Sequence, residues 1–309
     1  MIAVLCGGVG AARLLAGARR VVAGGELVAV VNTGDDLELF GLSVSPDLDT
    51  ITYTLAGEMN PESGWGRRGE SFRALGELGR FGAPTWFGLG DLDLATHLYR
   101  SGRLAEGACL SEVTAEIAAA FGVTTRLLPM TDDRVRTRLR LEGGEEVAFQ
   151  EYFVHRRHSV AVDEVHYEGA ELATPAPGVA EALAAAEVVL IAPSNPIVSI
   201  GPILSVPGVA DALFARRSSV VAVSPIVGGV ALKGPADRLL VELGGRSSVG
   251  GVAECLAEVA GTLVIDRADA ALAGEVEAEG MRAVVADTVM RDPAVAEALT
   301  EVAIAAARP

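Results

Sequence analysis

The sequence predicts an α/β protein with a Rossmann-like, doubly wound, mostly parallel sheet and a smaller inserted α/β lobe. Three observations carry this prediction. The chain opens as strand, glycine turn, helix and strand; strands and helices alternate again from residue 179; and polar motifs recur where strands end. The 309 residues are half hydrophobic, which is enough for a sizeable core.

The first elements follow from local pattern. Residues 2–5 are a short apolar run that predicts a buried strand, residues 7–10 (Gly-Gly-Val-Gly) a turn, and residues 11–22 a helix. Residues 27–31 are β-branched and predict a second strand. This order is typical of the opening of a parallel sheet.

The middle of the chain predicts the smaller lobe. Ser111 is expected to cap a helix that Gly122 ends. Two short runs flank Gly143-Gly144, which predicts a hairpin. We expect one domain over residues 1–309, with the core at about 1–135 and 170–309 and the lobe at about 136–169.

The second half returns to alternating elements. The pattern predicts strands at 188–192, 219–223, 263–265 and 282–285, and helices at 179–186, 209–216, 250–260, 268–278 and 293–307.

Composition excludes several classes. A net charge of −16 argues against a nucleic-acid surface. Prolines interrupt the apolar run at 188–209, so no membrane span is expected. Three distant cysteines without metal spacing and no signal-peptide pattern at the N-terminus predict a reduced cytoplasmic protein.

The glycine turn is the first candidate site. Gly7, Gly8 and Gly10 would let a phosphate approach the backbone and the following helix N-terminus. Arg13 stands at the third glycine position of a dinucleotide fingerprint, so that fingerprint is broken. The alternative is a tight turn without a ligand.

Two acidic motifs follow. Asn32, Asp35 and Asp36 end the second strand, where an acid often holds a ribose; a simple turn explains them equally well. In Ser-Pro-Asp-Leu-Asp, Asp47 suits a first helical turn after a Ser45 cap and Pro46. Asp49 is less easily explained, and the two carboxylates together suit Mg²⁺.

Later polar residues add further candidates. Asp91 and Asp93 form a second pair near His97, although a lone helical histidine is more often structural. Ser194 and Asn195, with Ser199, follow a strand and can bond a base or sugar.

Lys233 is the only lysine among 25 basic side chains. It stands in a Gly/Pro frame and can contact a phosphate, although an exposed lysine without a role is an equal alternative. No pattern of a protein nucleophile or a zinc site is present.

In order along the chain, the motifs GGVGAARLL, VVNTGDD, SPDLDT, GWG, WFGLGD, LLPMTDD, FQEYFV, APSNPIVSIGPIL, SPIVGG with KGPAD, and ADTVM resemble 2-phospho-L-lactate transferase of coenzyme F420 biosynthesis, especially its actinobacterial type. The resemblance implies transfer of a phospho-lactyl or phospho-enolpyruvyl group from a guanosine diphosphate-linked donor to the deazaflavin Fo. It also implies release of GMP, formation of F420-0 or dehydro-F420-0, Mg²⁺, and a homodimer with a Rossmann-like core.

Site roles follow from this resemblance as expectations. Asp47 and Asp49 would hold the metal, and Asp49 would take the acceptor proton, so Asp49→Asn is expected to abolish turnover and keep the fold. Ser194 and Asn195 would face guanosine and Lys233 an anion of the donor. The remaining expected substrate-binding residues are Gly7, Gly8, Gly10, Asn32, Asp36, Thr50, Asp91 and Asp93.

One departure concerns the acceptor. The family usually has Gly-Asp-Arg-Asp where this chain has Leu92, and that arginine is thought to help hold Fo. Leu92 can neither donate a hydrogen bond nor carry charge from its side chain. Either Arg100 or Arg67 substitutes, or the acceptor is held differently or is altered.

Two rivals remain. A nucleotide-binding regulator of the gluconeogenesis-factor type would share the glycine opening, but it is expected to carry a serine-rich acidic motif that is missing from residues 30–41. An NAD-dependent oxidoreductase conflicts with the broken fingerprint.

Overall fold

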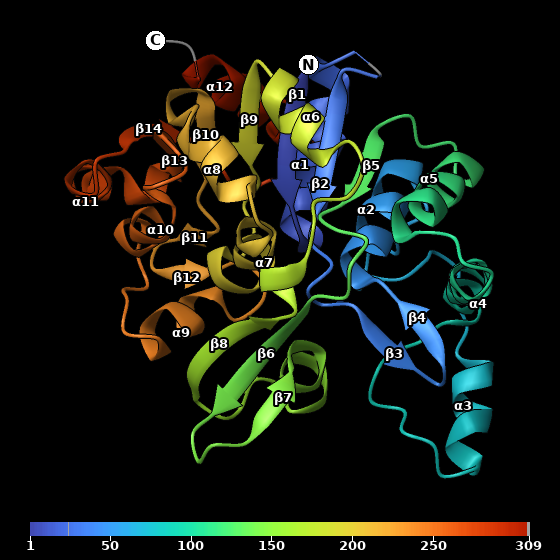
Figure 1. The fold of residues 1–309 in the computed structure, drawn as a ribbon. Helices are drawn as coiled ribbons and strands as arrows, with labels where there is room; N and C mark the ends of the chain where they lie inside the picture. The colour runs from blue at the N-terminus through green and yellow to red at the C-terminus, as the bar shows by residue number, and fades with distance from the viewer. Residues whose placement is uncertain (24, 308–309) are drawn as a thin grey trace.

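The computed structural model describes residues 1–23 and 25–307. Within these ranges, seven strands form one parallel sheet in the order β14-β13-β10-β9-β1-β2-β5 (Figure 1). This order confirms the predicted Rossmann-like fold, because the chain winds outward from β1 in both directions. The strands are β1 Ile2–Cys6, β2 Leu27–Val31, β5 Arg126–Pro129, β9 Val188–Ile191, β10 Val220–Val223, β13 Thr262–Asp266 and β14 Arg282–Ala286.

Helices cover both faces of the sheet, because successive strand residues point to opposite sides. Leu5 packs into one core with α6 Val179–Ala185, α7 Gly201–Ser205, α8 Val209–Phe214, α9 Ala236–Glu242, α10 Val249–Leu256 and α11 Ala273–Ala278. Val4 packs into the other core with α1 Gly8–Val21, α2 Pro46–Ala56, α5 Leu110–Ala120 and α12 Pro293–Ala306.

Two predicted details are wrong. Helix α5 begins after Cys109, and Ser111 lies inside its first turn, where its N–H and hydroxyl both donate to Asp132. Gly122 follows the helix with φ +67°, as a helix stop requires. The helix predicted at 268–278 begins as the 3₁₀ turn η5 Arg267–Leu272, and only then continues as α11.

A second, antiparallel sheet lies beyond the carboxyl ends of the parallel strands (Figure 1). It consists of β7 Glu146–Ala148, β6 Arg136–Leu141 and β8 Val162–Glu168, and the predicted hairpin around Gly143-Gly144 is present. A short π-helix, η1 Glu151–His155, follows β7.

Other elements were not predicted in detail. They are the hairpin β3 Leu37–Leu39 with β4 Leu42–Val44, α3 Arg73–Arg80, α4 Asp91–Ala105, the π-helix η3 Pro196–Ile200, the hairpin β11 Ile226–Val227 with β12 Val230–Ala231, and the 3₁₀ turns η2 Ala170–Leu172 and η4 Arg217–Ser219.

The strand order places a topological switch point at the carboxyl ends of β1 and β9. Strands β9 and β2 pair with opposite sides of β1. The chain runs from β1 to β2 on one side and from β9 to β10 on the other, so these two connections lead away from each other. Open parallel sheets bind ligands at this switch point, outside the carboxyl ends of the strands. Gly7 follows β1, Asn32 follows β2 and Ser194 follows shortly after β9, so three predicted motifs reach the same edge.

Helices α1 and α12 approach so closely that one glycine between them is required. A Cβ on Gly17 of α1 would lie 2.4 Å from the backbone carbonyl of Ala296 in α12. On Gly102 of α4, a Cβ would meet nothing within 4 Å.

We therefore expect opposite results from the same substitution in two helices. Gly17→Ala should lower the free energy of unfolding by about 1–3 kcal/mol, because overpacking displaces backbone. Gly102→Ala should raise it by about 0.5–1 kcal/mol, because alanine restricts the unfolded chain and favours helix. Urea unfolding of both variants measures this, and a Gly17→Ala variant as stable as Gly102→Ala would contradict the packing.

Candidate active site

A cavity of about 620 Å³ opens at the carboxyl edge of the parallel sheet. Its walls come from the turns after β1, β9, β10 and β14, from the start of α2, and from the region around η1. Eight residues expected from the sequence line it: Gly7, Gly8, Gly10, Asp47, Thr50, Ser194, Asn195 and Lys233.

The glycine turn is packed against polar side chains on both sides. The Gly7 N–H donates to Ser194 Oγ at 3.3 Å, and the Ser194 hydroxyl donates back to the Gly7 carbonyl at 2.8 Å. The Gly8 N–H donates to Asp47 Oδ1 at 2.8 Å. A Cβ on Gly10 would lie 2.6 Å from the Pro193 carbonyl oxygen, so a larger residue does not fit there. The later N–H groups in the first turn of α1 therefore remain for an anion.

Asp47 is a buried carboxylate at the floor of the cavity. Pro46 starts α2 as expected, but the Ser45 hydroxyl donates to Asp36 and does not cap the helix. Asp47 Oδ2 accepts from Asn32 Nδ2 at 3.0 Å, so Asn32 positions this carboxylate without lining the cavity itself. Burial raises the pKa of Asp47 to about 6, although the bonds from Asn32 and Gly8 oppose the shift.

Asp35 brings a second carboxylate to the same cavity, whereas Asp36 lies behind it. Asp35 Oδ1 is buried and has no hydrogen-bond partner among the described residues. Burial and the nearby charge of Asp47 raise the pKa of Asp35 well above its ordinary value. Burial raises the pKa of Asp36 to about 7, against the opposing charge of Arg136. The sequence singled out this acidic turn and selected Asp36 as the substrate-binding residue, whereas the structure places Asp35 in the cavity wall.

Asp49 turns away from Asp47, because residues two apart on a helix point in different directions. Its carboxylate bonds both terminal nitrogens of Arg100, with Arg100 NH1 at 3.1 Å from Oδ2. Asp49 is 5% exposed and is not part of the cavity wall in the described chain. The two aspartates therefore do not form one clamp.

The second acidic pair also has structural partners. Asp91 accepts the N–H groups of Arg73 and Ala74 at the start of α3, at 3.2 and 3.0 Å. Asp93 accepts the Tyr53 hydroxyl at 2.6 Å. The nearby His97 side chain and the hydrogen bond from Tyr53 keep the pKa of Asp93 below its ordinary value although burial alone would raise it. Neither aspartate lines the cavity in the described chain.

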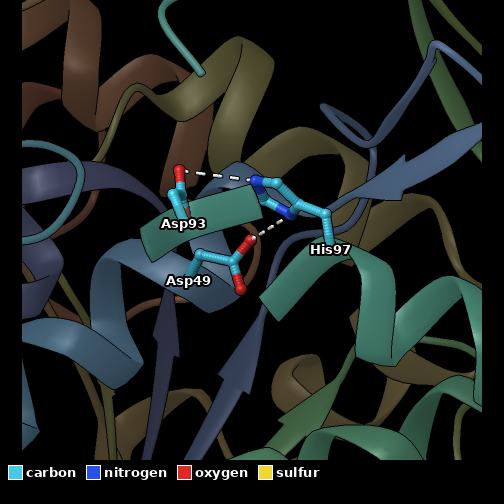
Figure 2. A group of neighbouring side chains, drawn as sticks. All are labelled: Asp49, Asp93 and His97. Atoms are coloured by element: carbon cyan, nitrogen blue, oxygen red, sulfur yellow. Dashed lines mark ion pairs between the residues drawn. The ribbon is translucent and has the colours of Figure 1, made fainter. Parts of the chain in front are cut away.

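Figure 2 shows the His97 imidazole between Asp49 and Asp93. Its Nδ1 lies 3.6 Å from Asp49 and its Nε2 lies 3.4 Å from Asp93. These three side chains have the atoms and spacing to hold a metal ion. However, the Arg100 guanidinium already supplies the positive charge beside Asp49, so we interpret the group as a buried ionic network that joins α2 to α4.

Neither arginine proposed as a substitute for the family arginine is free for an acceptor. Arg100 is 2% exposed and is bonded to Asp49. Arg67 lies over the rings of Tyr53 and Phe121 and pairs with Glu58 at 3.3 Å. Leu92 is 40% exposed, and its N–H donates to Glu70 at 3.2 Å. None of these three residues lines the cavity in the described chain.

Asn195 retains one free donor. Its Oδ1 accepts the N–H groups of Ile197 and Val198, at 2.9 and 3.3 Å, and caps the π-helix η3. Its Nδ2 is buried without a partner in the part of the chain that the structure describes. A buried amide donor on a cavity wall is suited to a ligand oxygen or ring nitrogen.

One wall of the cavity is aromatic and was missed from the sequence. Phe149 and Phe153 stack at 5.5 Å, and Trp65 packs where a Cβ on Gly88 would lie 2.5 Å from its ring. The segments GWG, FQEYFV and ADTVM carry part of the missed lining, but they were used only as ordered motifs. Further lining residues that the sequence did not predict include Arg13, Phe87, Gln150, Thr288 and Met290.

Among the helices of residues 1–23 and 25–307, none combines the length and apolar character needed to cross a membrane.

Comparison with known proteins gives a consistent result. Residues 2–304 match the family model described as 2-phospho-L-lactate transferase CofD. The chain is 46% identical to a phosphoenolpyruvate transferase of Streptomyces griseus subsp. griseus over 94% of this chain and 93% of the relative. A phosphoenolpyruvate transferase of Kitasatospora aureofaciens is 42% identical over 99% and 97%.

The fold also matches solved structures. A crystal structure of a UPF0052 family member from Bacillus halodurans superposes with a TM-score of 0.64 over 98% of both chains. Its sequence identity is 15%, so this likeness supports the fold alone.

Proposed function

Since the chain belongs to the 2-phospho-L-lactate transferase CofD family, we propose that it transfers a phospho-enolpyruvyl group from a guanosine diphosphate-linked donor to the deazaflavin Fo, with release of GMP. The matching family model and relatives confirm the resemblance that the sequence motifs indicated. The relatives named phosphoenolpyruvate transferase favour enolpyruvate over lactate as the three-carbon acid of the donor.

The single observation that carries the proposal is the composition of the cavity. It joins two buried carboxylates, Asp35 and Asp47, to a glycine turn and to a stacked aromatic wall. Carboxylates that hold a divalent cation and a glycine turn both suit a phosphorylated nucleotide, and a flat heteroaromatic acceptor fits the third feature.

The donor would lie across the switch point between β1 and β9. Asn195 Nδ2 is the free buried donor for the guanosine. The first turn of α1 would face the phosphates with its N–H groups and the positive end of its dipole. Ser194, which is bonded to Gly7 in both directions, holds the glycine turn in shape.

We propose Mg²⁺ as the cofactor, held by Asp35 and Asp47. Two buried carboxylates with raised pKa values, one with an unpartnered oxygen, fit a hard cation that accepts oxygen ligands. When bound, the ion supplies positive charge for the phosphates of the donor. The sequence predicted Asp49 as the second metal ligand. We assign Asp35 instead, because the Asp49 carboxylate is bonded to Arg100.

The reaction needs little covalent help from the protein. An alcohol oxygen of Fo forms a bond to the phosphorus that bears the three-carbon acid, and the bond from that phosphorus to the GMP oxygen breaks. The hydroxyl proton passes to one of the two cavity carboxylates, Asp35 or Asp47. Positioning and charge account for most of the acceleration in such phosphoryl transfers.

The acceptor would be held by its ring. Phe149, Phe153, Trp65 and Phe87 offer apolar surface in the cavity, and Gln150 offers an amide beside them. This arrangement does not require a charged residue at Leu92.

The proposal is tested by incubating the protein with Fo, Mg²⁺ and either the enolpyruvyl or the lactyl guanosine diphosphate donor. Mass spectrometry should find dehydro-F420-0 and an equal amount of GMP with the enolpyruvyl donor. If a product forms only with the lactyl donor, lactate and not enolpyruvate is the three-carbon acid of the donor. Tight guanine-nucleotide binding without GMP release from either donor would contradict the proposal and favour a nucleotide-binding regulator.

A further inference from the structure

Two cationic side chains, Arg13 and Lys233, line the cavity from different segments. Arg13 lies in the second turn of α1, directly after the glycine turn, and Lys233 lies in the loop between β12 and α9. Lys233 was singled out from the sequence, whereas Arg13 was noted only as a residue that breaks a dinucleotide fingerprint.

Neither cation has a carboxylate partner. Arg20, on the same helix as Arg13, pairs with Glu297 at 3.6 Å, and Arg100 pairs with Asp49. Within the 4.0 Å of an ion pair, no carboxylate of residues 1–23 or 25–307 reaches Arg13 or Lys233. Other arginines of the described chain also lack an ion pair, and what distinguishes Arg13 and Lys233 is that both line the same cavity.

The two cations also act on each other and are held in place. Burial lowers the pKa of Lys233, and the charge of Arg13 lowers it further. Arg13 NH1 donates to the Met290 carbonyl at 3.4 Å. Lys233 Nζ packs over Gly64, where a Cβ would lie 2.5 Å away. Like charges kept together without a counter-ion are stabilised when a multiply charged anion binds between them.

We propose that Arg13 and Lys233 form a two-cation clamp for the outer end of the donor, the phosphate that bears the three-carbon acid together with its carboxylate. This inference rests on the proposed function. The outer phosphate and the carboxylate each carry about one negative charge near neutral pH, which matches the two cations. Asp35 and Asp47 would bind the metal at the cavity floor. Arg13 and Lys233 would supply the positively charged side chains of the same site.

The clamp is tested with GDP and GMP as probes, because GMP lacks the outer phosphate. In calorimetric titrations with Mg²⁺, wild-type protein should bind GDP more tightly than GMP. Arg13→Gln and Lys233→Gln should each weaken GDP binding about tenfold or more, which is typical of a lost charge-assisted hydrogen bond. GMP binding should change little. Arg20→Gln is the matched control and should bind both nucleotides like wild type.

A second readout follows the reactivity of Lys233. Lys233 is the only lysine, so acylation mapped to its peptide reports one side chain. Arg13→Gln should raise the pKa of Lys233 and slow its acylation at pH 7–8, and GDP should protect Lys233 in the wild type. Unchanged acylation in Arg13→Gln, or equal weakening of GMP and GDP, would overturn the clamp. Absence of turnover by wild type with a normal GDP preference would instead overturn only the proposed function.

Discussion

Asp47→Asn is expected to abolish turnover and leave the fold intact. The carboxylate fixes Gly8 and is fixed by Asn32, and it faces the cavity with Asp35. An amide can accept only one of these two bonds and carries no charge for a metal. Turnover should fall at least about 100-fold, since even small displacements of reacting groups cost this much. Steady-state kinetics with the enolpyruvyl donor and Fo measures the loss.

The fold survives because the ionised carboxylate is not favoured by its surroundings. Burial raises the pKa of Asp47 from 3.8 to about 6, so the folded state disfavours the ionised carboxylate relative to the unfolded chain. The stability contributed by this group is present below its unfolded pKa and is lost as the pH rises through about 6. At pH 7.5 without metal, loss of this unfavourable charge should offset the hydrogen bond that asparagine cannot accept, so Asp47→Asn should remain folded.

Thermal unfolding separates the functional from the structural effect. Mg²⁺ should raise the melting temperature of the wild type at pH 7.5, because a ligand of the folded state stabilises it. This gain should disappear in Asp47→Asn and persist in Asp211→Asn, an exposed control on α8. Wild-type turnover in Asp47→Asn would remove this carboxylate from the site.

Much of the fold could be predicted because its signals are local. Buried strands, the glycine turn after β1 and the polar residues after β2 and β9 stand in the order of a doubly wound sheet. The strand order itself follows from the handedness and short connections of such folds. Helix ends were less certain: Ser111 suits a cap by type, but Cys109 occupies that position in the structure.

The site was only partly predictable, because its side chains come from distant segments. Asp47 and Asp49 look equivalent in sequence. Only the way α2 packs against α4 places the Asp49 carboxylate beside Arg100. The aromatic wall depends on how the segment with η1 folds over the sheet edge, which periodicity does not specify. Nothing in the sequence distinguished Arg13 as a site residue, because the chain has many arginines and several of them lie in the same predicted helix.

Arg100→Met is expected to cause the largest loss of stability. The guanidinium is 2% exposed and bonds Asp49, the Ser43 carbonyl at 3.3 Å and His97 Nδ1 at 3.2 Å. Methionine has a similar length but leaves the Asp49 carboxylate buried without its cation. Breaking a buried pair on one side costs about 3–5 kcal/mol. Urea unfolding at pH 7.5 should show this loss, whereas Arg103→Met, a surface arginine one turn along α4, should unfold close to wild type.

The double variant Asp49→Asn with Arg100→Met decides between a lost charge pair and lost packing. Removing both charges leaves no uncompensated ion at Asp49, so most of the stability lost in Arg100→Met should return. Asp49→Asn alone strands the guanidinium, so it should unfold at lower urea than wild type, contrary to the expectation from the sequence. If the double variant is as unstable as Arg100→Met, the arginine acts through packing. Full recovery with turnover retained would show that Asp49 is needed only for stability, because α2 then carries Asp47 correctly without it.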